Sequence, residues 1–92
     1  MKLDTPTTYP ALSGVSEKKI NYGSACRQHW LRAANDMARE IAAATAAESA
    51  VAMPMLQHIV DVALLDTSAK AWIERESPLE LMQAAIIKGG LA

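Results

Sequence analysis

The sequence contains no phenylalanine, one cysteine, and only four glycines and four prolines among its 92 residues. A single cysteine cannot form an internal disulfide, so no covalent cross-link of that kind supports the fold. Such cysteine usage is typical of a reducing compartment. Because the chain is short and has no disulfide, we expect modest stability unless it associates with a partner or with itself.

The chain also lacks a strong charge and a long uninterrupted apolar run. Its formal net charge is −1, so a strong non-specific attraction to nucleic acid or to anionic membranes is not expected. Its most apolar stretch, residues 41–65, is interrupted by polar residues and by Pro54, which argues against a transmembrane helix. The first sixteen residues show no secretory signal. We therefore expect a cytoplasmic protein without membrane contact.

Helix-forming residues dominate the composition, and β-branched residues never alternate as they would in a strand. A chain of this length makes one domain. These observations predict an all-α fold, a small three- to four-helix bundle. Residues 1–15 contain Pro6 and Pro10 and are predicted to be a flexible, irregular N-terminal arm, while residues 16–92 are predicted to form a single helical domain.

Two helices are predicted in the first half of the helical domain. Ser16 has the character of an N-cap and begins a short helix over residues 17–22. Gly23 favours a helix end, and a second helix is predicted over residues 24–51. Ten of the twenty residues from Ala33 to Ala52 are alanine. A helix this small in side-chain volume needs another helix close against it to exclude water.

Two further helices are predicted in the second half. Pro54 fits the first position of a helix, so we expect one over residues 54–66, which possibly runs on to 76. This helix is the most apolar in the chain and is expected to be the central buried element. Ser77, Pro78 and Glu80 form the pattern of a capping box, which predicts a last helix over residues 78–88.

The residues with catalytic or metal-binding potential form no coherent site in such a bundle. Cys26 and His29 are three residues apart, as are His58 and Asp61, and together they have the chemistry of a zinc site. If the chain folds back near residue 53, the two pairs are separated by about 27 Å along the helix. We therefore expect no metal, no cofactor and no catalytic residue, and predict that the protein is not an enzyme.

The favoured function is a non-enzymatic protein-interaction module that self-associates and acts as an adaptor, inhibitor, chaperone or assembly component. Small helical domains of this size often gain stability from a partner subunit. The partner's identity does not follow from the sequence. The candidate interface residues are the large apolar side chains of the arm, the alanine-rich helix and the later tryptophan: Tyr9, Leu12, Trp30, Met37, Ile41, Val51 and Trp72.

The alternative function is a small nucleic-acid- or nucleotide-binding regulator. Lys18, Lys19, Arg27 and Arg32 form a modest basic group, and Tyr22 or Trp30 would stack on a base. Salt separates the two hypotheses, because phosphate binding weakens steeply with ionic strength whereas apolar binding does not.

Overall fold

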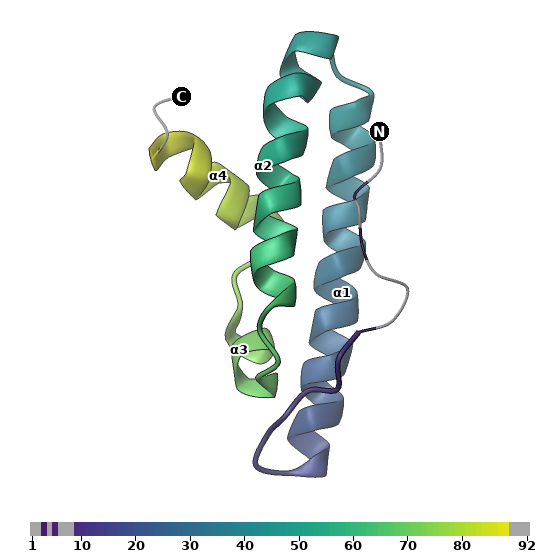
Figure 1. Ribbon diagram of the computed structural model, residues 1–92, viewed down its shortest axis with the longest axis vertical. Coiled ribbons are helices and arrows are strands. Elements are labelled where there is room, and N and C mark those ends of the chain that lie inside the picture. The colour runs from purple at the N-terminus through teal and green to yellow at the C-terminus, as the bar shows by residue number, and fades with distance from the viewer. Residues whose placement is uncertain (1–2, 4, 6–8, 89–92) are drawn as a thin grey trace.

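The computed structural model describes residues 3, 5 and 9–88, and its four helices form a small bundle (Figure 1). The helices are α1 (Glu17–Ala42), α2 (Ala46–Leu64), α3 (Ala69–Glu74) and α4 (Pro78–Lys88). Within the described ranges the only strand-like pairing is an isolated bridge between Ser13 and Ser68. The prediction of a small all-α bundle is confirmed. Of the predicted irregular arm, residues 9–15 form no helix, and residues 1, 2, 4 and 6–8 lie outside the described residues.

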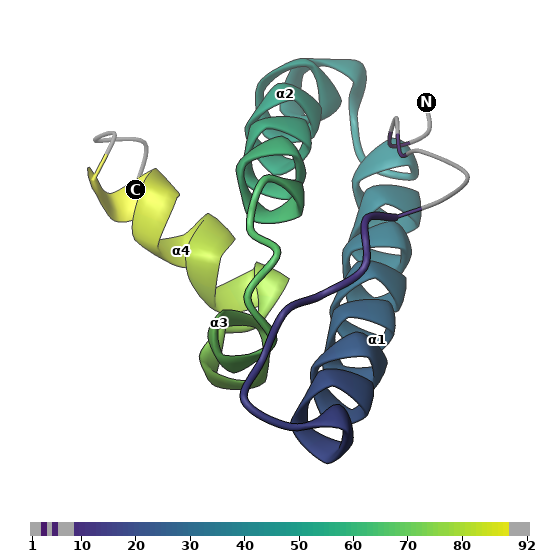
Figure 2. The same ribbon diagram turned by 60° about the horizontal axis from the view of Figure 1, so that its bottom comes forward.

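Helices α1 and α2 form an antiparallel hairpin, and the two shorter helices pack against it at different places. Helix α3 lies against the N-terminal half of α1, and α4 begins beside both long helices and then diverges from them (Figure 2). One core joins all four helices and includes Leu56 and Val60, which are fully buried. The arm contributes Leu12 to the same core, with 6% of its surface exposed.

Helix α1 is continuous through Gly23, so the predicted joint between residues 22 and 24 is wrong. Its start is as predicted, because the Ser16 hydroxyl accepts a hydrogen bond from the backbone N–H of Lys19 at 3.2 Å. Gly23 is buried, and a methyl group placed on it would lie 2.8 Å from the Cα atom of Ala69. The glycine therefore permits the close approach of α3 and does not end a helix.

The turn between the long helices lies earlier than predicted, so both the helix over 24–51 and the joint at Pro54 are wrong. Helix α1 ends at Ala42, and Thr45 caps α2 in a full capping box with Glu48. Each member of this box satisfies a backbone N–H of the other. Pro54 instead lies in the middle of α2, and its side chain is exposed to solvent. The packing of α2 against α1 therefore contributes more free energy than the proline costs inside the helix.

The hairpin buries two alanines of the alanine-rich segment, while the six alanines between residues 42 and 50 are exposed. Ala34 and Ala38 are 0% and 3% exposed and share the core with Leu56 and Val60. Small side chains at these positions let the two helices approach closely. The expectation that residues 54–66 form the central buried element is only half right, because one face of α2 is buried while Leu65 on the other is 82% exposed.

Helices α3 and α4 are separate short elements, so α2 does not run on to residue 76. Helix α4 follows its prediction: Pro78 is its first residue, and the Ser77 hydroxyl accepts from the N–H of Glu80 at 3.2 Å. Helix α3 is held by the arm, since Ser13 donates to the carbonyl of Thr67 and accepts from the N–H of Ala69, both at 2.8 Å. The chain between α2 and α4 is thereby fixed against α1.

Candidate binding pocket

Two tryptophans from distant parts of the chain meet at the junction of α1 and α3. The rings of Trp30 and Trp72 are in edge-to-face contact, with centroids 5.5 Å apart and planes at 76°. Their indole N–H groups donate to the backbone carbonyls of Glu76 and Asp66, each at 2.8 Å. Both side chains are buried, at 5% and 2% exposure. The pair is therefore rigid, because packing and hydrogen bonding together fix both rings.

An apolar pocket of about 410 Å³ opens directly beside this tryptophan pair. It lies between one face of α1 and the chain from α3 to the start of α4. A volume of this size falls within the range of pockets that bind small molecules or single large side chains. The lining residues are Tyr22, Ala25, Cys26, His29, Trp30, Ala33, Trp72, Ile73, Arg75, Ser77 and Pro78.

The pocket has aromatic walls and few polar groups. Tyr22 is 60% exposed at its edge, whereas the two tryptophans are buried beneath. The guanidinium of Arg75 lies over the Trp72 ring, 4.6 Å from its centroid, and donates to Asp66 Oδ2 at 3.0 Å. The guanidinium therefore forms part of the pocket wall, stacked on Trp72 and hydrogen-bonded to Asp66. The pocket therefore favours an apolar group over a charged one.

Cys26 and His29 both line this pocket, one helical turn apart on α1, as their spacing predicts. His58 and Asp61 are placed elsewhere, exposed on α2, and Asp61 accepts from the side-chain amide of Gln57 at 2.8 Å. Among residues 3, 5 and 9–88, no three histidine, cysteine or acidic side chains are grouped closely enough to hold a metal ion. The pocket's chemistry is that of binding through apolar contact.

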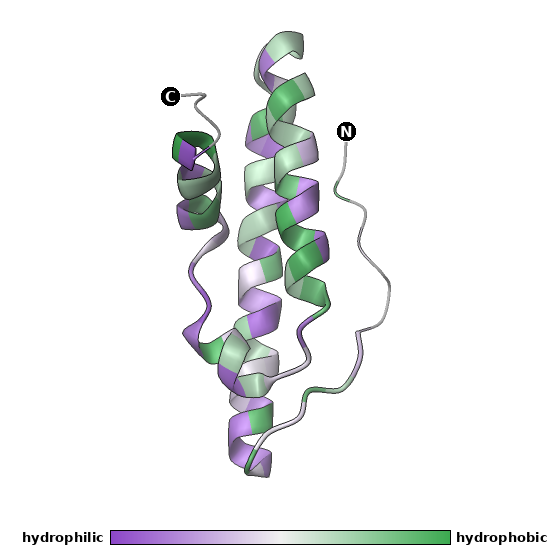
Figure 3. Cartoon of the chain, turned by 60° about the vertical axis from the view of Figure 1, so that its left-hand side comes forward, coloured by the Kyte–Doolittle hydropathy of each residue, from purple (hydrophilic) through white to green (hydrophobic). Residues whose placement is uncertain are grey.

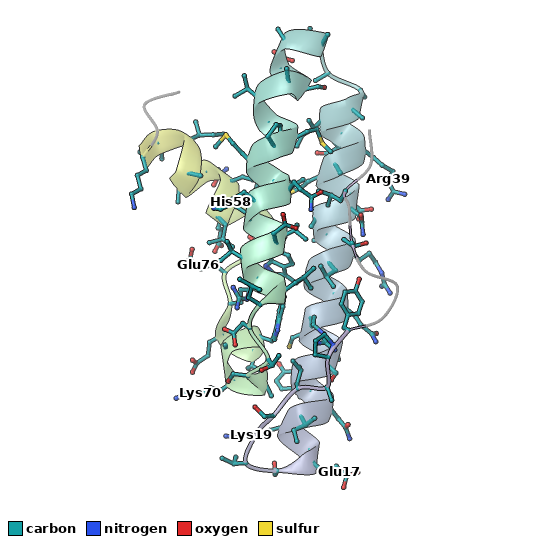
Figure 4. All side chains as sticks on the ribbon, in the orientation of Figure 1. Glu17, Lys19, Arg39, His58, Lys70 and Glu76 are labelled. Atoms are coloured by element: carbon teal, nitrogen blue, oxygen red, sulfur yellow. The ribbon has the colours of Figure 1, made fainter. Side chains whose placement is uncertain are left out.

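Three lysines are exposed on the parts of α1 and α3 that precede the pocket residues Tyr22 and Trp72 in the sequence. Lys18 and Lys19 lie one turn before Tyr22 on α1. Lys19 and Lys70 extend from the lower end of the bundle on the α3 side, while Glu76 lies further up (Figure 4).

The structure does not gather the four predicted cations into one site. The Arg27 guanidinium donates to the carbonyl of Pro10 at 2.8 Å and lies 5.2 Å from the centre of the Tyr9 ring. Arg27 thus holds the arm against α1. Arg32 lines a second hollow of about 390 Å³, which also contains Tyr9 and both members of the Asp36–Arg39 ion pair.

The candidate interface residues divide between the core and the surface. Leu12, Trp30 and Trp72 are buried in the chain's own core, so they are not free anchors. Met37, Ile41 and Tyr9 are half-buried against it. Val51 is 51% exposed on the outside of α2. Trp30 and Trp72 nevertheless line the pocket, with 5% and 2% of their surfaces exposed.

Sequence reasoning did not predict Ile73, Arg75 and Pro78 as pocket residues. Their role depends on where the chain turns after α2. Ser68 caps the helix that follows this turn, but this local signal does not give the direction in which the chain continues. Searches against protein-family models, curated proteins and solved structures found no match. In the described part of the chain, every helix is too short or too polar to cross a membrane.

Proposed function

We propose that the protein is a non-enzymatic interaction module whose tryptophan-floored pocket receives a large apolar side chain of a partner protein. The observation that carries the proposal is the open apolar pocket of about 410 Å³ on a rigid tryptophan pair. Rigid aromatic surfaces bind with little loss of conformational freedom, and buried anchors of this kind dominate protein–protein affinity. An adaptor, inhibitor, chaperone or assembly component would use such a site.

The preferred partner segment has an acidic residue next to its apolar anchor. Lys18 and Lys19 are exposed one turn before Tyr22 on α1, and Lys70 is exposed two residues before Trp72 on α3, so an acidic neighbour of the anchor would be attracted toward them. Contacts of this kind at the rim of an interface add specificity and association rate more than affinity. The anchor itself accounts for most of the binding energy, so the complex should be insensitive to salt.

The test uses peptides selected from a random displayed library against the wild-type protein. We expect the selected peptides to share an aromatic or leucine anchor beside an acidic residue. Ala33→Trp fills the pocket from its wall and should weaken their binding at least tenfold. Gln28→Trp places the same bulk in the second hollow and should leave binding unchanged. The indole N–H resonances of Trp30 and Trp72 should shift when the wild-type protein binds a peptide.

Peptides whose binding is unaffected by Ala33→Trp would overturn the proposal. Binding of a single-stranded oligonucleotide would also overturn it in favour of the nucleic-acid alternative, under two conditions. Its affinity would have to fall steeply with salt, and it would have to be lost when Lys18, Lys19, Arg27 and Arg32 are changed to alanine.

A further inference from the structure

Residues 9–13 of the N-terminal arm are docked on α1 at one end and on α3 at the other. The guanidinium of Arg27, on α1, donates to the Pro10 carbonyl at 2.8 Å and lies 5.2 Å from the centre of the Tyr9 ring. The Leu12 side chain is buried in the core. Figure 3 shows that this part of the arm and α3 both lie at the end of the bundle where α1 begins. The arm is therefore anchored on both helices that build the pocket.

The arm holds the first turn of α3 through backbone hydrogen bonds and close packing. The N–H of Ser13 donates to the carbonyl of Thr67, and the N–H of Ala69 donates to the carbonyl of Ser13, both at 2.8 Å. Ala69 is fully buried, and two glycines approach it. A methyl group placed on Gly14 would lie 3.3 Å from the Cβ atom of Ala69, and one placed on Gly23 would lie 2.8 Å from it. The start of α3 is thus clamped between the arm and α1.

The same segment of the chain positions one wall of the pocket. Trp72 lies one helical turn after Ala69, and its backbone N–H donates to the carbonyl of Ser68 at 3.2 Å. Its indole N–H donates to the carbonyl of Asp66 at 2.8 Å. The carboxylate of Asp66 accepts from Arg75, which also lines the pocket. A shift of this segment would therefore move the tryptophan wall.

The arm and the pocket are two distinct sites on either part of α3. The lining residues of the pocket all fall between Tyr22 and Pro78, outside the arm. The arm contacts α3 at its start, whereas a ligand in the pocket would contact Trp72 and Ile73 further along the same helix. Two sites that share one movable element can influence each other without touching.

We propose that the arm regulates the pocket, because the docked arm and a bound partner side chain stabilise the same position of α3. This inference rests on the proposed function of the pocket. Such coupling is reciprocal, so the docked arm raises the affinity for the partner by the factor by which the partner favours docking of the arm. The affinity falls with the fraction of molecules in which the arm is docked. A factor that detaches the arm would thereby weaken binding without touching the pocket.

The first measurement loosens the arm and leaves every pocket residue in place. Arg27→Met removes the donor to the Pro10 carbonyl and the cation beside the Tyr9 ring. Arg39→Met is the matched control, because it removes the same charge from an exposed position of α1 that pairs with Asp36. For a peptide selected against the wild-type protein, we expect Arg27→Met to weaken binding at least threefold and Arg39→Met to leave it unchanged.

The second measurement restores docking by a covalent link. In a Cys26→Ser background, Ser13→Cys and Ser68→Cys allow a disulfide, because the two positions are paired in the bridge and paired backbones lie about 5 Å apart, within the range of a disulfide. With Arg27→Met added, the oxidised form should bind the peptide at least threefold more tightly than the reduced form. It should also bind as tightly as the oxidised form without Arg27→Met.

The reciprocal effect is measured on the same Arg27→Met protein in a glutathione buffer. There the two introduced thiols are oxidised to one disulfide while one oxidised glutathione is reduced to two thiols. A saturating peptide should favour the protein disulfide by the same factor that separates the affinities of the oxidised and reduced forms. The same peptide with its apolar anchor replaced by alanine should leave the equilibrium unchanged.

The outcomes separate this inference from the proposed function. Equal binding of the peptide by the oxidised and reduced Arg27→Met proteins would overturn the coupling and leave the function of the pocket standing. An equal effect of Arg27→Met and Arg39→Met would do the same.

If no peptide binds the pocket, the proposed function fails, and the indole N–H resonance of Trp72 decides whether the arm controls the wall. That resonance, assigned with Trp72→Phe, should shift between the oxidised and reduced Arg27→Met proteins. An unchanged resonance would refute any control of the wall by the arm.

Discussion

The close contact between Gly23 and Ala69 allows a quantitative prediction for Gly23→Ala. The added methyl group has two opposing effects on stability, a gain in helix propensity and a clash with Ala69. Gly23→Ala improves helix propensity by about 1 kcal/mol. The added methyl group would lie 2.8 Å from both the Cα and the Cβ of Ala69 and 3.0 Å from its carbonyl oxygen. Two of these atoms belong to the backbone and cannot rotate aside. Overpacking typically costs about 1–3 kcal/mol, and contacts of 2.8 and 3.0 Å with backbone atoms put this site at the upper end of that range. The clash therefore outweighs the propensity gain.

We therefore expect Gly23→Ala to destabilise the protein by about 1–2 kcal/mol, which lowers the melting temperature by roughly 4–16 °C for a domain of this size. Thermal unfolding followed by circular dichroism measures the shift. Asn21 is exposed on the same helix, so comparing Asn21→Gly with Asn21→Ala isolates the propensity effect. Adding Ala69→Gly to Gly23→Ala should recover part of the loss. A Gly23→Ala protein more stable than wild type would refute a close approach of α3 to α1.

Three further changes test other parts of the fold, and urea unfolding measures each. Pro54→Ala should stabilise the protein by about 1–2 kcal/mol, because it restores a helical N–H at an exposed site of α2; a loss of stability would argue that α2 does not continue through this residue. Thr45→Ala should cost about 1 kcal/mol by removing the cap of α2, and an unchanged midpoint would contradict the turn at residues 43–45. Trp30→Phe should cost about 1–2 kcal/mol by removing the donor to the Glu76 carbonyl, whereas a neutral result would exclude that hydrogen bond.

Local signals correctly predicted where α1 and α4 begin. Ser16 and Ser77 cap α1 and α4 as their patterns predict. The two wrong joints came from Gly23 and Pro54, which usually interrupt helices. At both positions, contacts with residues far away in the sequence keep the helix continuous. Helix α3 packs against Gly23, and the packing of α2 on α1 keeps α2 helical through Pro54. Tertiary packing outweighs intrinsic propensities of a few kcal/mol.

One boundary signal was present in the sequence and was overlooked. Thr45 and Glu48 have the spacing of a capping box, and they begin α2. The surrounding alanines favour helix strongly, and this preference conceals the signal. With the turn at residues 43–45, Ala34 and Ala38 face α2 within the same chain. These two alanines are therefore covered by the chain itself, whereas the alanines between residues 42 and 50 remain exposed.

The candidate site was only partly predictable, because its two walls come from distant segments. The spacing of Cys26 and His29 correctly placed both side chains on one face of α1. Nothing in the sequence, however, indicated that Trp72 and Pro78 would lie opposite them. That arrangement follows from the path of the chain between α2 and α4.

The backbone bridge between Ser13 and Ser68 affects which part of the molecule unfolds first. Helix α3 has six residues, far fewer than the 12–15 or so that an isolated helix needs to persist in water. It is therefore held by its neighbours, Gly23 on one side and the arm on the other. When the arm detaches, α3 loses one of its two supports, and the Trp72 wall of the pocket is released with it. In hydrogen exchange, the amides of Ser13, Ala69 and Trp72 should behave as one cooperative unit, less stable than the α1–α2 hairpin.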